Sequence, residues 1–341
     1  MASPVQTSRI WPAEQAATWY ARQGWLVGCN FIPSTAINEL EMWQADTFDP
    51  TTIHRELSLA ESLGMNAVRV YLHNLAWETD ADGFKERIHV FLDLAELHHI
   101  KVIFVLFDDC WNENPQPGKQ PEPQHGVHNS GWLQAPGKER LLHPETWGSL
   151  EAYVQDILRT FDGDERVLLW DLYNEPGNSG YLLQSMPLLQ KAFEWAWAVR
   201  PSQPLTSAPW NPEFTELNAF QLDNSDVLTF HNYLDVENLE AEIRMLQERG
   251  RPIICTEYMA RTLNSRFDTH LAIFKRHNIG AINWGLVAGK TNTIYPWKTV
   301  PDMDGPVVWF HDIFYPDGSV YDPKEAAVIR AMTGAAAESV A

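Results

Sequence analysis

The feature of this chain that most constrains its fold is a repeated alternation of short, continuous apolar runs with longer amphipathic stretches. Runs that are apolar throughout are typical of strands buried on both faces, as parallel strands are in α/β proteins. Strands are predicted in this way at residues 25–32, 67–72, 101–107, 167–173, 204–208, 227–232, 252–258 and 280–287. The alternation therefore predicts a series of βαβ units and a parallel sheet.

The stretches between these runs have helical periodicity. Residues 50–63 carry Leu57, Ala60 and Leu63 at helical spacing and stop before Gly64, which is a common helix terminator. By the same reasoning, helices are expected at residues 50–63, 84–98, 144–160, 183–198, 237–249, 266–277 and 322–332.

Eight strand–helix units in succession favour a closed (β/α)₈ barrel, a TIM barrel, over an open doubly wound sheet. The doubly wound fold would place a glycine-rich turn after the first strand, and this turn reads Ile32-Pro33-Ser34-Thr35. The chain has no linker or sharp change of composition, and α/β barrels of this length occur as one domain. A single domain is therefore expected over residues 1–341, with the barrel at about 25–332.

Three connections of the predicted barrel are long. They are residues 33–49, 108–143 and 288–321, which follow the first, third and eighth strands. Long loops are uncommon in compact domains unless they are functional, and barrel active sites lie in the loops at the C-terminal ends of the strands. Polar and aromatic residues at these ends are therefore the candidates for function.

The charge of the chain limits its partners. A formal net charge of −20 disfavours binding to nucleic acid or to an anionic membrane surface. No apolar stretch is long enough for a transmembrane helix, which needs about 18–20 residues, and the N-terminus lacks the apolar run of a signal peptide. The chain as it stands is expected to be cytoplasmic, or secreted or periplasmic if an export signal has been removed. The sequence does not indicate an oligomeric state.

The thiols and imidazoles of the chain do not form a metal-binding pattern. Cys29, Cys110 and Cys255 are far apart, so free thiols are expected rather than a disulfide framework or a zinc site. The histidines in the long loop after the third predicted strand, residues 108–143, are irregularly spaced. No metal site is therefore predicted.

Two carboxylates stand where opposite strands of the predicted barrel end. The fourth strand runs into Asn174-Glu175-Pro176, and the seventh ends at Glu257. Glycoside hydrolysis needs such a pair, because one carboxyl group protonates the leaving oxygen while the other acts at the sugar carbon. A separation of ~5–5.5 Å permits direct attack with retention, whereas ~6.5–9.5 Å leaves room for an inverting water. Glycoside hydrolysis is the chemistry that this arrangement predicts.

That Asn-Glu-Pro triplet and Glu257, each on the appropriate strand, resemble the signature of glycoside hydrolase clan A, and most closely family 5, the cellulase and mannanase type. The resemblance extends from Trp25 to about residue 332. It implies a retaining β-glycosidase that works by double displacement on a carbohydrate substrate, with no cofactor and no catalytic metal.

The resemblance also implies a role for individual residues. Glu175 is the expected acid/base and Glu257 the expected nucleophile. Supporting side chains are implied around this pair: Asn174 for the sugar 2-hydroxyl, Arg69 to keep the nucleophile ionised, His231 and Tyr233 beside the nucleophile, and Trp284 as the aromatic floor of the cleaved sugar's subsite. Physical chemistry agrees, because a neighbouring arginine lowers the pKa of a carboxyl group and a facing negative charge raises it.

One segment departs from the family pattern. The third strand of the family often ends in a histidine, whereas this chain continues as Asp108-Asp109-Cys110-Trp111. Asp108 or Asp109 is expected to accept hydrogen bonds from sugar hydroxyls instead, and Trp111 is a candidate for substrate binding by sugar stacking, with loop packing as the alternative. Other loop tryptophans, Trp43, Trp132 and Trp297, suit loop packing and sugar stacking equally well.

The expected substrate is a neutral β-linked glycan or an oligosaccharide derived from it. Long loops after the third and eighth strands would close one end of the cleft, which favours exo-acting cleavage or short substrates. The alternative is an endo-β-glycanase of the cellulase, mannanase or xylanase type with an open cleft. A function of another class, a non-catalytic sugar-binding barrel, is disfavoured because both carboxylates are present.

Overall fold

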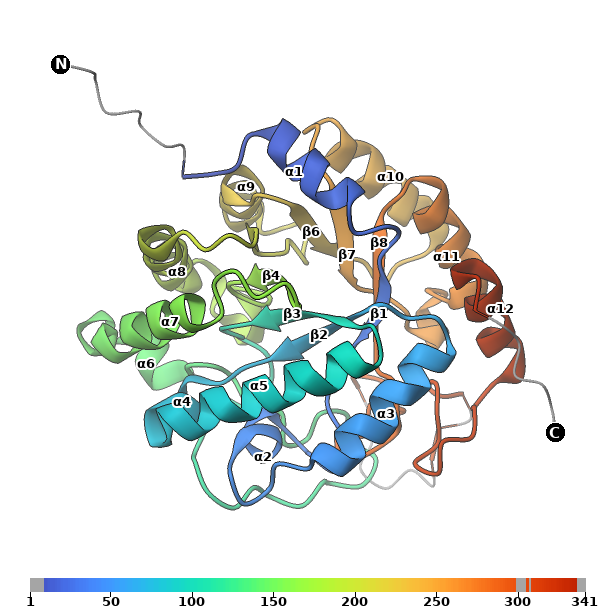
Figure 1. The fold of residues 1–341 in the computed structure, drawn as a ribbon, viewed down its shortest axis with the longest axis horizontal. Coiled ribbons are helices and arrows are strands. Elements are labelled where there is room, and N and C mark those ends of the chain that lie inside the picture. The colour runs from blue at the N-terminus through green and yellow to red at the C-terminus, as the bar shows by residue number, and fades with distance from the viewer. Residues whose placement is uncertain (1–8, 299–304, 307, 336–341) are drawn as a thin grey trace.

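The structure, a computed structural model, describes residues 9–298, 305–306 and 308–335. Eight parallel strands surrounded by helices form a (β/α)₈ barrel (Figure 1). Each strand lies within its predicted range: β1 (Val27–Asn30), β2 (Ala67–Tyr71), β3 (Lys101–Val105), β4 (Val167–Asp171), β5 (Leu205–Thr206), β6 (Leu228–His231), β7 (Ile253–Glu257) and β8 (Gly280–Trp284).

The strands are hydrogen-bonded in the order β5-β4-β3-β2-β1-β8-β7-β6. The remaining seam, between β5 and β6, is bridged by the amide of Asp226, which donates to the Leu205 carbonyl at 2.8 Å. The hydroxyl of Thr206 donates to the Val227 carbonyl, also at 2.8 Å. The barrel is therefore nearly closed, and β5 is its shortest strand.

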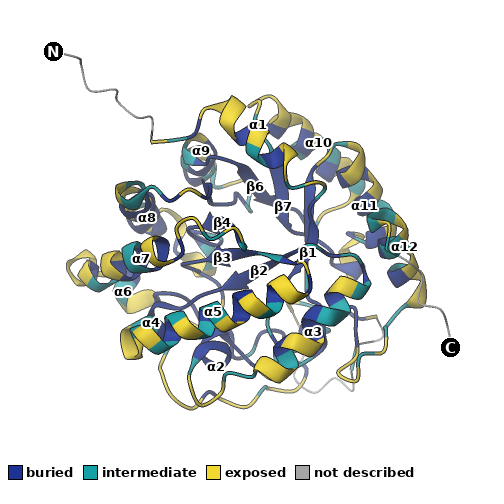
Figure 2. Ribbon diagram, in the orientation of Figure 1, coloured by how far each residue is buried: buried dark blue, intermediate teal, exposed yellow. Residues whose placement is uncertain are grey.

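Helices cover the outside of the barrel, with buried residues toward the strands and exposed residues toward solvent (Figure 2). The seven predicted helices are present as α3 (Pro50–Ser62), α5 (Ala81–Leu97), α7 (Gly148–Thr160), α8 (Met186–Val199), α10 (Val236–Gln247), α11 (Phe267–Arg276) and α12 (Pro323–Thr333). Five further helices were not predicted: α1 (Ala13–Ala21), α2 (Glu39–Trp43), α4 (Asn74–Thr79), α6 (Lys138–Leu142) and α9 (Thr215–Asn224). None of the helices in the described part of the chain is long and apolar enough to cross a membrane.

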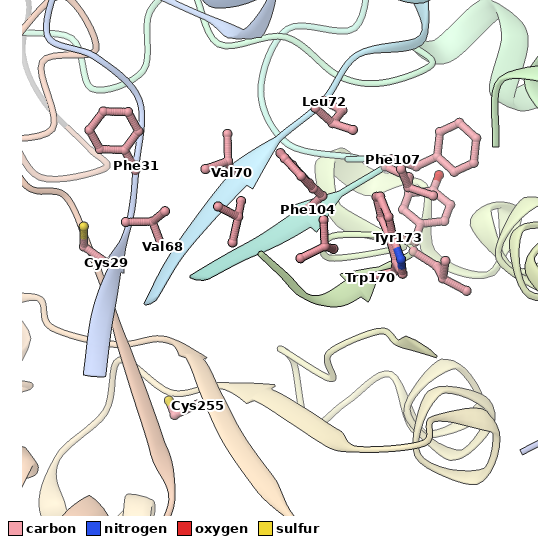
Figure 3. Close-up of a cluster of buried hydrophobic side chains, with 14 of the residues drawn as sticks. Cys29, Phe31, Val68, Val70, Leu72, Phe104, Phe107, Trp170, Tyr173 and Cys255 are labelled. Carbon is pink, nitrogen blue, oxygen red and sulfur yellow. The ribbon is translucent and has the colours of Figure 1, made fainter. Parts of the chain in front are cut away.

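The two faces of each strand have different surroundings. Val68 and Val70 of β2 join Phe104 and Trp170 of the next strands in the layer between barrel and helices (Figure 3). In that layer the rings of Phe104 and Trp170 stack with centroids 5.6 Å apart. Because side chains alternate along a strand, the residue between the two valines, Arg69, points into the barrel instead.

The bottom of the barrel is filled by apolar side chains. Ala67, Ile103, Leu169, Ile254 and Ile282 form a cluster there with residues of the N-terminal segment, namely Trp11, Ala16 and Tyr20. The amide of Trp11 donates to Asp226 at 2.7 Å, and its carbonyl accepts from Arg251 at 2.9 Å. The N-terminal segment therefore plugs the barrel below the polar layer that contains Arg69.

The three cysteines, Cys29, Cys110 and Cys255, are buried and unpaired. This confirms the prediction of free thiols. Cys29 and Cys255 lie in the outer apolar layer, whereas Cys110 lies beside the C-terminal end of the barrel.

Trp43 belongs to the core rather than to a sugar-binding surface. Its ring is fully buried, meets Phe84 edge-on at 5.6 Å and donates through Nε1 to the Tyr71 carbonyl at 2.8 Å. Trp43→Ala should lower the free energy of unfolding by about 3–5 kcal/mol, because it leaves a large cavity. Urea unfolding measures this loss. Trp297→Ala is the matched control, since that ring is 40% exposed and should cost only about 1 kcal/mol; equal losses would contradict the assignment.

Candidate active site

Six strands end in a polar or aromatic residue that belongs to one constellation. These residues are Asn30, Tyr71, Asp171, His231, Glu257 and Trp284. They come together because parallel strands of a barrel end at the same mouth. Above them lies a cavity of about 920 Å³, which Glu175 and Glu257 both line.

Glu257 is held by three hydrogen-bond donors. Its Oε1 accepts from Arg69 Nη1 and from the Tyr71 hydroxyl, each at 2.9 Å. Its Oε2 accepts from the Tyr233 hydroxyl at 2.8 Å. The carboxyl group is therefore fixed in orientation and stabilised in its ionised form.

Arg69 is fully buried and connects several strands. Its Nε and Nη2 donate to Asp171 Oδ2 at 3.1 and 2.8 Å. Nη2 also donates to Asn174 Oδ1 at 2.7 Å, and Nη1 donates to Asn30 Oδ1 at 2.8 Å. The guanidinium is thus shared between Asp171 and Glu257. The sequence analysis assigned no role to Asp171 or Asn30, although both stand at strand ends.

Glu175 has different surroundings. It follows β4 with a backbone φ of 45°, a left-handed conformation that is strained for a residue other than glycine. Its Oε1 lies 2.8 Å from His231 Nδ1, and its Oε2 accepts from Asn178 Nδ2 at 2.6 Å and from the Cys110 thiol at 3.3 Å. Among the described residues, no lysine or arginine makes an ion pair with Glu175.

The two carboxyl groups face each other across the cavity floor. One oxygen of Glu175, one oxygen of Glu257 and a ring nitrogen of His231 all lie within 4.8 Å of one another. This spacing is close to the ~5–5.5 Å of retaining glycosidases and too short for the ~6.5–9.5 Å of inverting enzymes. The same three atoms are close enough to hold a metal ion, but Arg69 already provides the positive charge at Glu257.

Burial raises the pKa of both carboxyl groups above the ordinary value. For Glu175, hydrogen bonds from Cys110 and Asn178 oppose this effect. For Glu257, burial raises the pKa most, and His231 and Arg69 lower it; the expected lowering effect of Arg69 is therefore present, although burial outweighs it. Of the two carboxyl groups, only Glu257 accepts hydrogen bonds directly from Arg69 and from two tyrosine hydroxyls, and such contacts favour the ionised form.

Asp108 lines the cavity, but both oxygens of its carboxyl group already accept hydrogen bonds from other residues of the protein. Oδ1 accepts from Asn174 Nδ2 and from the Cys110 amide, each at 2.9 Å, and Oδ2 accepts from Trp132 Nε1 at 2.8 Å. Burial raises the pKa of Asp108 to about 6. This residue therefore orients Asn174 and Trp132, instead of presenting a free acceptor as the sequence analysis expected.

Asp109 does not lie on the cavity wall among the described residues. Its oxygens accept from the Tyr173 hydroxyl at 2.6 Å, the Gly177 amide at 2.8 Å and the Ser185 hydroxyl at 2.5 Å. The expectation of a sugar contact is therefore not met. Asp109 instead braces the loop that carries Glu175.

Tryptophans form much of the cavity wall. Trp284 meets Trp132 at 5.5 Å and Tyr71 at 5.9 Å, in both cases edge-on. Trp111 and Trp297 also line the cavity and are 39% and 40% exposed. Trp284 and Trp111 are thus where the sequence analysis expected them, and Trp132 and Trp297 lie on the cavity as well.

The long loops after β3 and β8 are joined across one side of the cavity. The Asn129 amide donates to the Thr291 carbonyl at 2.8 Å, and His128 Nδ1 lies 2.7 Å from the Tyr295 carbonyl. Burial lowers the pKa of His128 to about 4, so the ring is neutral and donates this bond. The loop after β1 joins them, because Lys290 Nζ contacts Glu41 at 2.7 Å. We call these three joined loops the rim wall.

Solved structures with this fold include several glycosidases. A GH5_18 variant from Streptomyces cattleya in complex with Manβ1-4GlcNAc aligns with a TM-score of 0.62 and 13% identity, over 92% of this chain and 81% of that one. β-Glucosidase 1317 gives 0.60 and 12%, over 92% and 100%. The endo-1,4-β-mannanase from Rhizomucor miehei gives 0.58 and 16%, over 92% and 94%. At these identities the likeness concerns the fold.

Sequence comparison is more specific. No protein of curated function matches the chain. The family model of the cellulases, glycosyl hydrolase family 5, matches residues 29–289, which include both carboxylates and every strand end described above. The chain therefore belongs to glycosyl hydrolase family 5 of clan A, a family of retaining enzymes, and is a β-glycoside hydrolase.

Proposed function

We propose that this enzyme removes short units from one end of neutral β-linked oligosaccharides, with Glu257 as nucleophile and Glu175 as acid/base. One observation supports these roles above all. The two carboxyl groups have oxygens within 4.8 Å of each other, yet of these two groups only Glu257 accepts a hydrogen bond from Arg69. A nucleophile must be ionised and an acid protonated, and the surroundings of the two groups differ in this sense.

In the first step, an oxygen of Glu257 attacks the anomeric carbon as the bond to the leaving oxygen breaks. Glu175 transfers its proton to that oxygen, so the leaving group departs as an alcohol. The product is a glycosyl ester of Glu257, and Glu175 is left ionised. Asn174 is held by Asp108 and Arg69, which fixes it for a contact with the sugar 2-hydroxyl.

In the second step, Glu175 accepts a proton from water as the water oxygen attacks the anomeric carbon and the ester bond breaks. Burial lowers the pKa of His231 to about 4, so its ring is neutral in both steps. Its Nδ1, 2.8 Å from Glu175, can donate to the ionised carboxylate, and Asn178 and Cys110 do the same at the other oxygen. These three donors favour the ionised form that Glu175 has after the first step.

The rim wall supports cleavage from one end. It occupies the side of the cavity next to Trp284 and Trp132, and its hydrogen bonds connect three loops into one barrier. A long glycan would have to cross this barrier to bind on both sides of the scissile bond. A short terminal unit needs only the space between the barrier and the catalytic pair.

The test is product analysis with β-1,4-linked gluco-, manno- and xylo-oligosaccharides and with the matching polysaccharides. We expect one short product to be released from the start of the reaction, and little loss of polysaccharide viscosity. A ladder of intermediate products with a rapid loss of viscosity would contradict end-directed cleavage and favour the open-cleft endoglycanase. Sugar binding with no cleavage of any β-glycoside would favour the other alternative, a non-catalytic sugar-binding barrel.

A further inference from the structure

The cavity has a second part, which the rim wall does not form. It is formed by the segments that follow β5, β6 and β7. Three large apolar side chains line it and are strongly exposed: Leu234 at 51%, Met245 at 50% and Leu263 at 40%. Exposed apolar side chains grouped at one pocket mark a surface that an apolar ligand covers. We call this part of the cavity the apolar groove.

Helix α10, which follows β6 (Figure 1), presents two distinct faces. Leu239, Ile243 and Leu246 are buried against the barrel. Ala241 and Met245 line the cavity instead, one helical turn apart on another face. Met245 is therefore exposed toward the cavity and does not lie on the outer, solvent-facing surface of the helix.

The charge of the cavity excludes an anionic ligand. Four of its lining residues carry carboxyl groups, namely Asp108, Glu175, Glu242 and Glu257, and none of the described lining residues is a lysine or an arginine. A phosphate, sulfate or uronate group would therefore find no lysine or arginine to pair with in this lining. Glu242, at the groove, accepts from Asn232 Nδ2 at 2.7 Å, and burial raises its pKa to about 7.

The kind of apolar residue narrows the ligand further. Sugar faces are flat and rigid and stack on flat rings such as Trp210, which also lines this part of the cavity, but its three strongly exposed apolar side chains, Leu234, Met245 and Leu263, are aliphatic. Unbranched, flexible methionine adapts to irregular or mobile apolar partners. A flexible hydrocarbon chain matches this surface better than a second sugar ring does.

We propose that the apolar groove binds an alkyl chain, so that the enzyme hydrolyses uncharged amphiphilic β-glycosides. This inference rests on the proposed function. The glycosidic oxygen takes the proton of Glu175 and leaves as the long-chain alcohol, the sugar is held as the ester of Glu257, and water then releases it. The alcohol departs along the groove, which is continuous with the catalytic pair within one cavity.

The test uses alkyl β-D-glucosides and β-D-mannosides from methyl to octyl, each below the concentration at which it aggregates. We expect kcat/KM to rise roughly two- to fourfold for each methylene added between butyl and octyl, as burial of a methylene predicts. The acidity of the leaving alcohol barely changes between butyl and octyl. A rise in kcat/KM over this range therefore results from contacts of the alkyl chain with the enzyme and not from a better leaving group. A flat series would overturn the inference.

Two variants test whether the dependence of kcat/KM on chain length arises in the apolar groove. The double change Met245→Ser and Leu263→Ser should flatten the dependence of kcat/KM on chain length, measured against the methyl glycoside of the same variant. Leu97→Ser is the matched control, since Leu97 is 65% exposed on α5 and does not line the cavity; it should keep the full dependence. A dependence that survives the double change would also overturn the inference, because the chain would then bind elsewhere.

The outcomes separate the inference from the proposed function. If β-linked oligosaccharides are cleaved but alkyl glycosides show no chain-length effect, the groove is a sugar subsite and only the inference fails. If no β-glycoside of either kind is cleaved by the folded enzyme, the proposed function fails with it.

Discussion

Alanine at Glu175 should slow hydrolysis of unactivated β-glycosides by about 10²–10⁴-fold, the usual contribution of a positioned acid/base. With an activated aryl glycoside the first step should survive, because its leaving group needs little protonation. The glycosyl ester on Glu257 should then accumulate, since no base activates water. Azide needs no base, so it should restore turnover and give the β-glycosyl azide from the α-linked ester.

Alanine at Glu257 should be far more damaging, with a loss on the order of 10⁶-fold as for other lost nucleophiles. Any azide product of this variant should have the α configuration, because azide would attack the intact β-glycoside directly. Product configuration by NMR distinguishes the two variants. Glu242→Gln is the carboxylate control from the same cavity and should give no azide product. If the configurations of the Glu175 and Glu257 variants were exchanged, the two roles would be exchanged as well.

Replacing Arg69 by methionine should lower both the stability and the turnover of the enzyme. The change leaves Asp171 and Glu257 buried without the cation that both contact. Breaking a buried ion pair in this way costs about 3–5 kcal/mol of stability. Turnover should also fall strongly, because Glu257 loses both its orientation and the charge that favours its ionised form.

The pH profile of Arg69→Met carries the more specific information. Without the guanidinium, Glu257 takes up its proton at higher pH, so the acid limb of kcat/KM should move to higher pH. Arg200→Met is the matched control. Arg200 pairs with the buried Asp226 at 2.8 Å and does not line the cavity, so its loss should reduce stability without moving the acid limb. An unshifted limb in Arg69→Met would mean that Arg69 only braces the barrel.

The strands were predictable because burial on both faces requires a continuous run of apolar residues, which is visible in the sequence. Even β5, with two residues, lies in its predicted range. Helix α9 was missed because its buried face consists of Leu217, Gln221 and Leu222, and a buried glutamine gives no apolar stripe. Gln221 is held by the Ser207 hydroxyl and the Ala208 carbonyl at 2.9 and 2.8 Å, contacts that no periodicity reveals.

The residues of the active site were likewise predicted only in part. Glu175 and Glu257 were identified from short motifs at strand ends. Asp108 or Asp109 was expected to contact the sugar, because a sequence gives the position of a carboxylate along a strand but not the donors around it. Tyr71 was missed although it lies two residues after Arg69 and therefore on the same inward face. Alternation along β2 was the available signal.

The plug at the bottom of the barrel has a consequence for the order of folding. Trp11 bonds to Asp226 and Arg251, partners 215 and 240 residues away in the chain. During synthesis, the segment around Trp11 therefore leaves the ribosome long before these partners, which follow 215 and 240 residues later. Contacts of such separation form late and slow the folding reaction. Until then, the apolar ends of β2, β3 and β4 are uncovered, which makes the unfinished chain a natural client for chaperones.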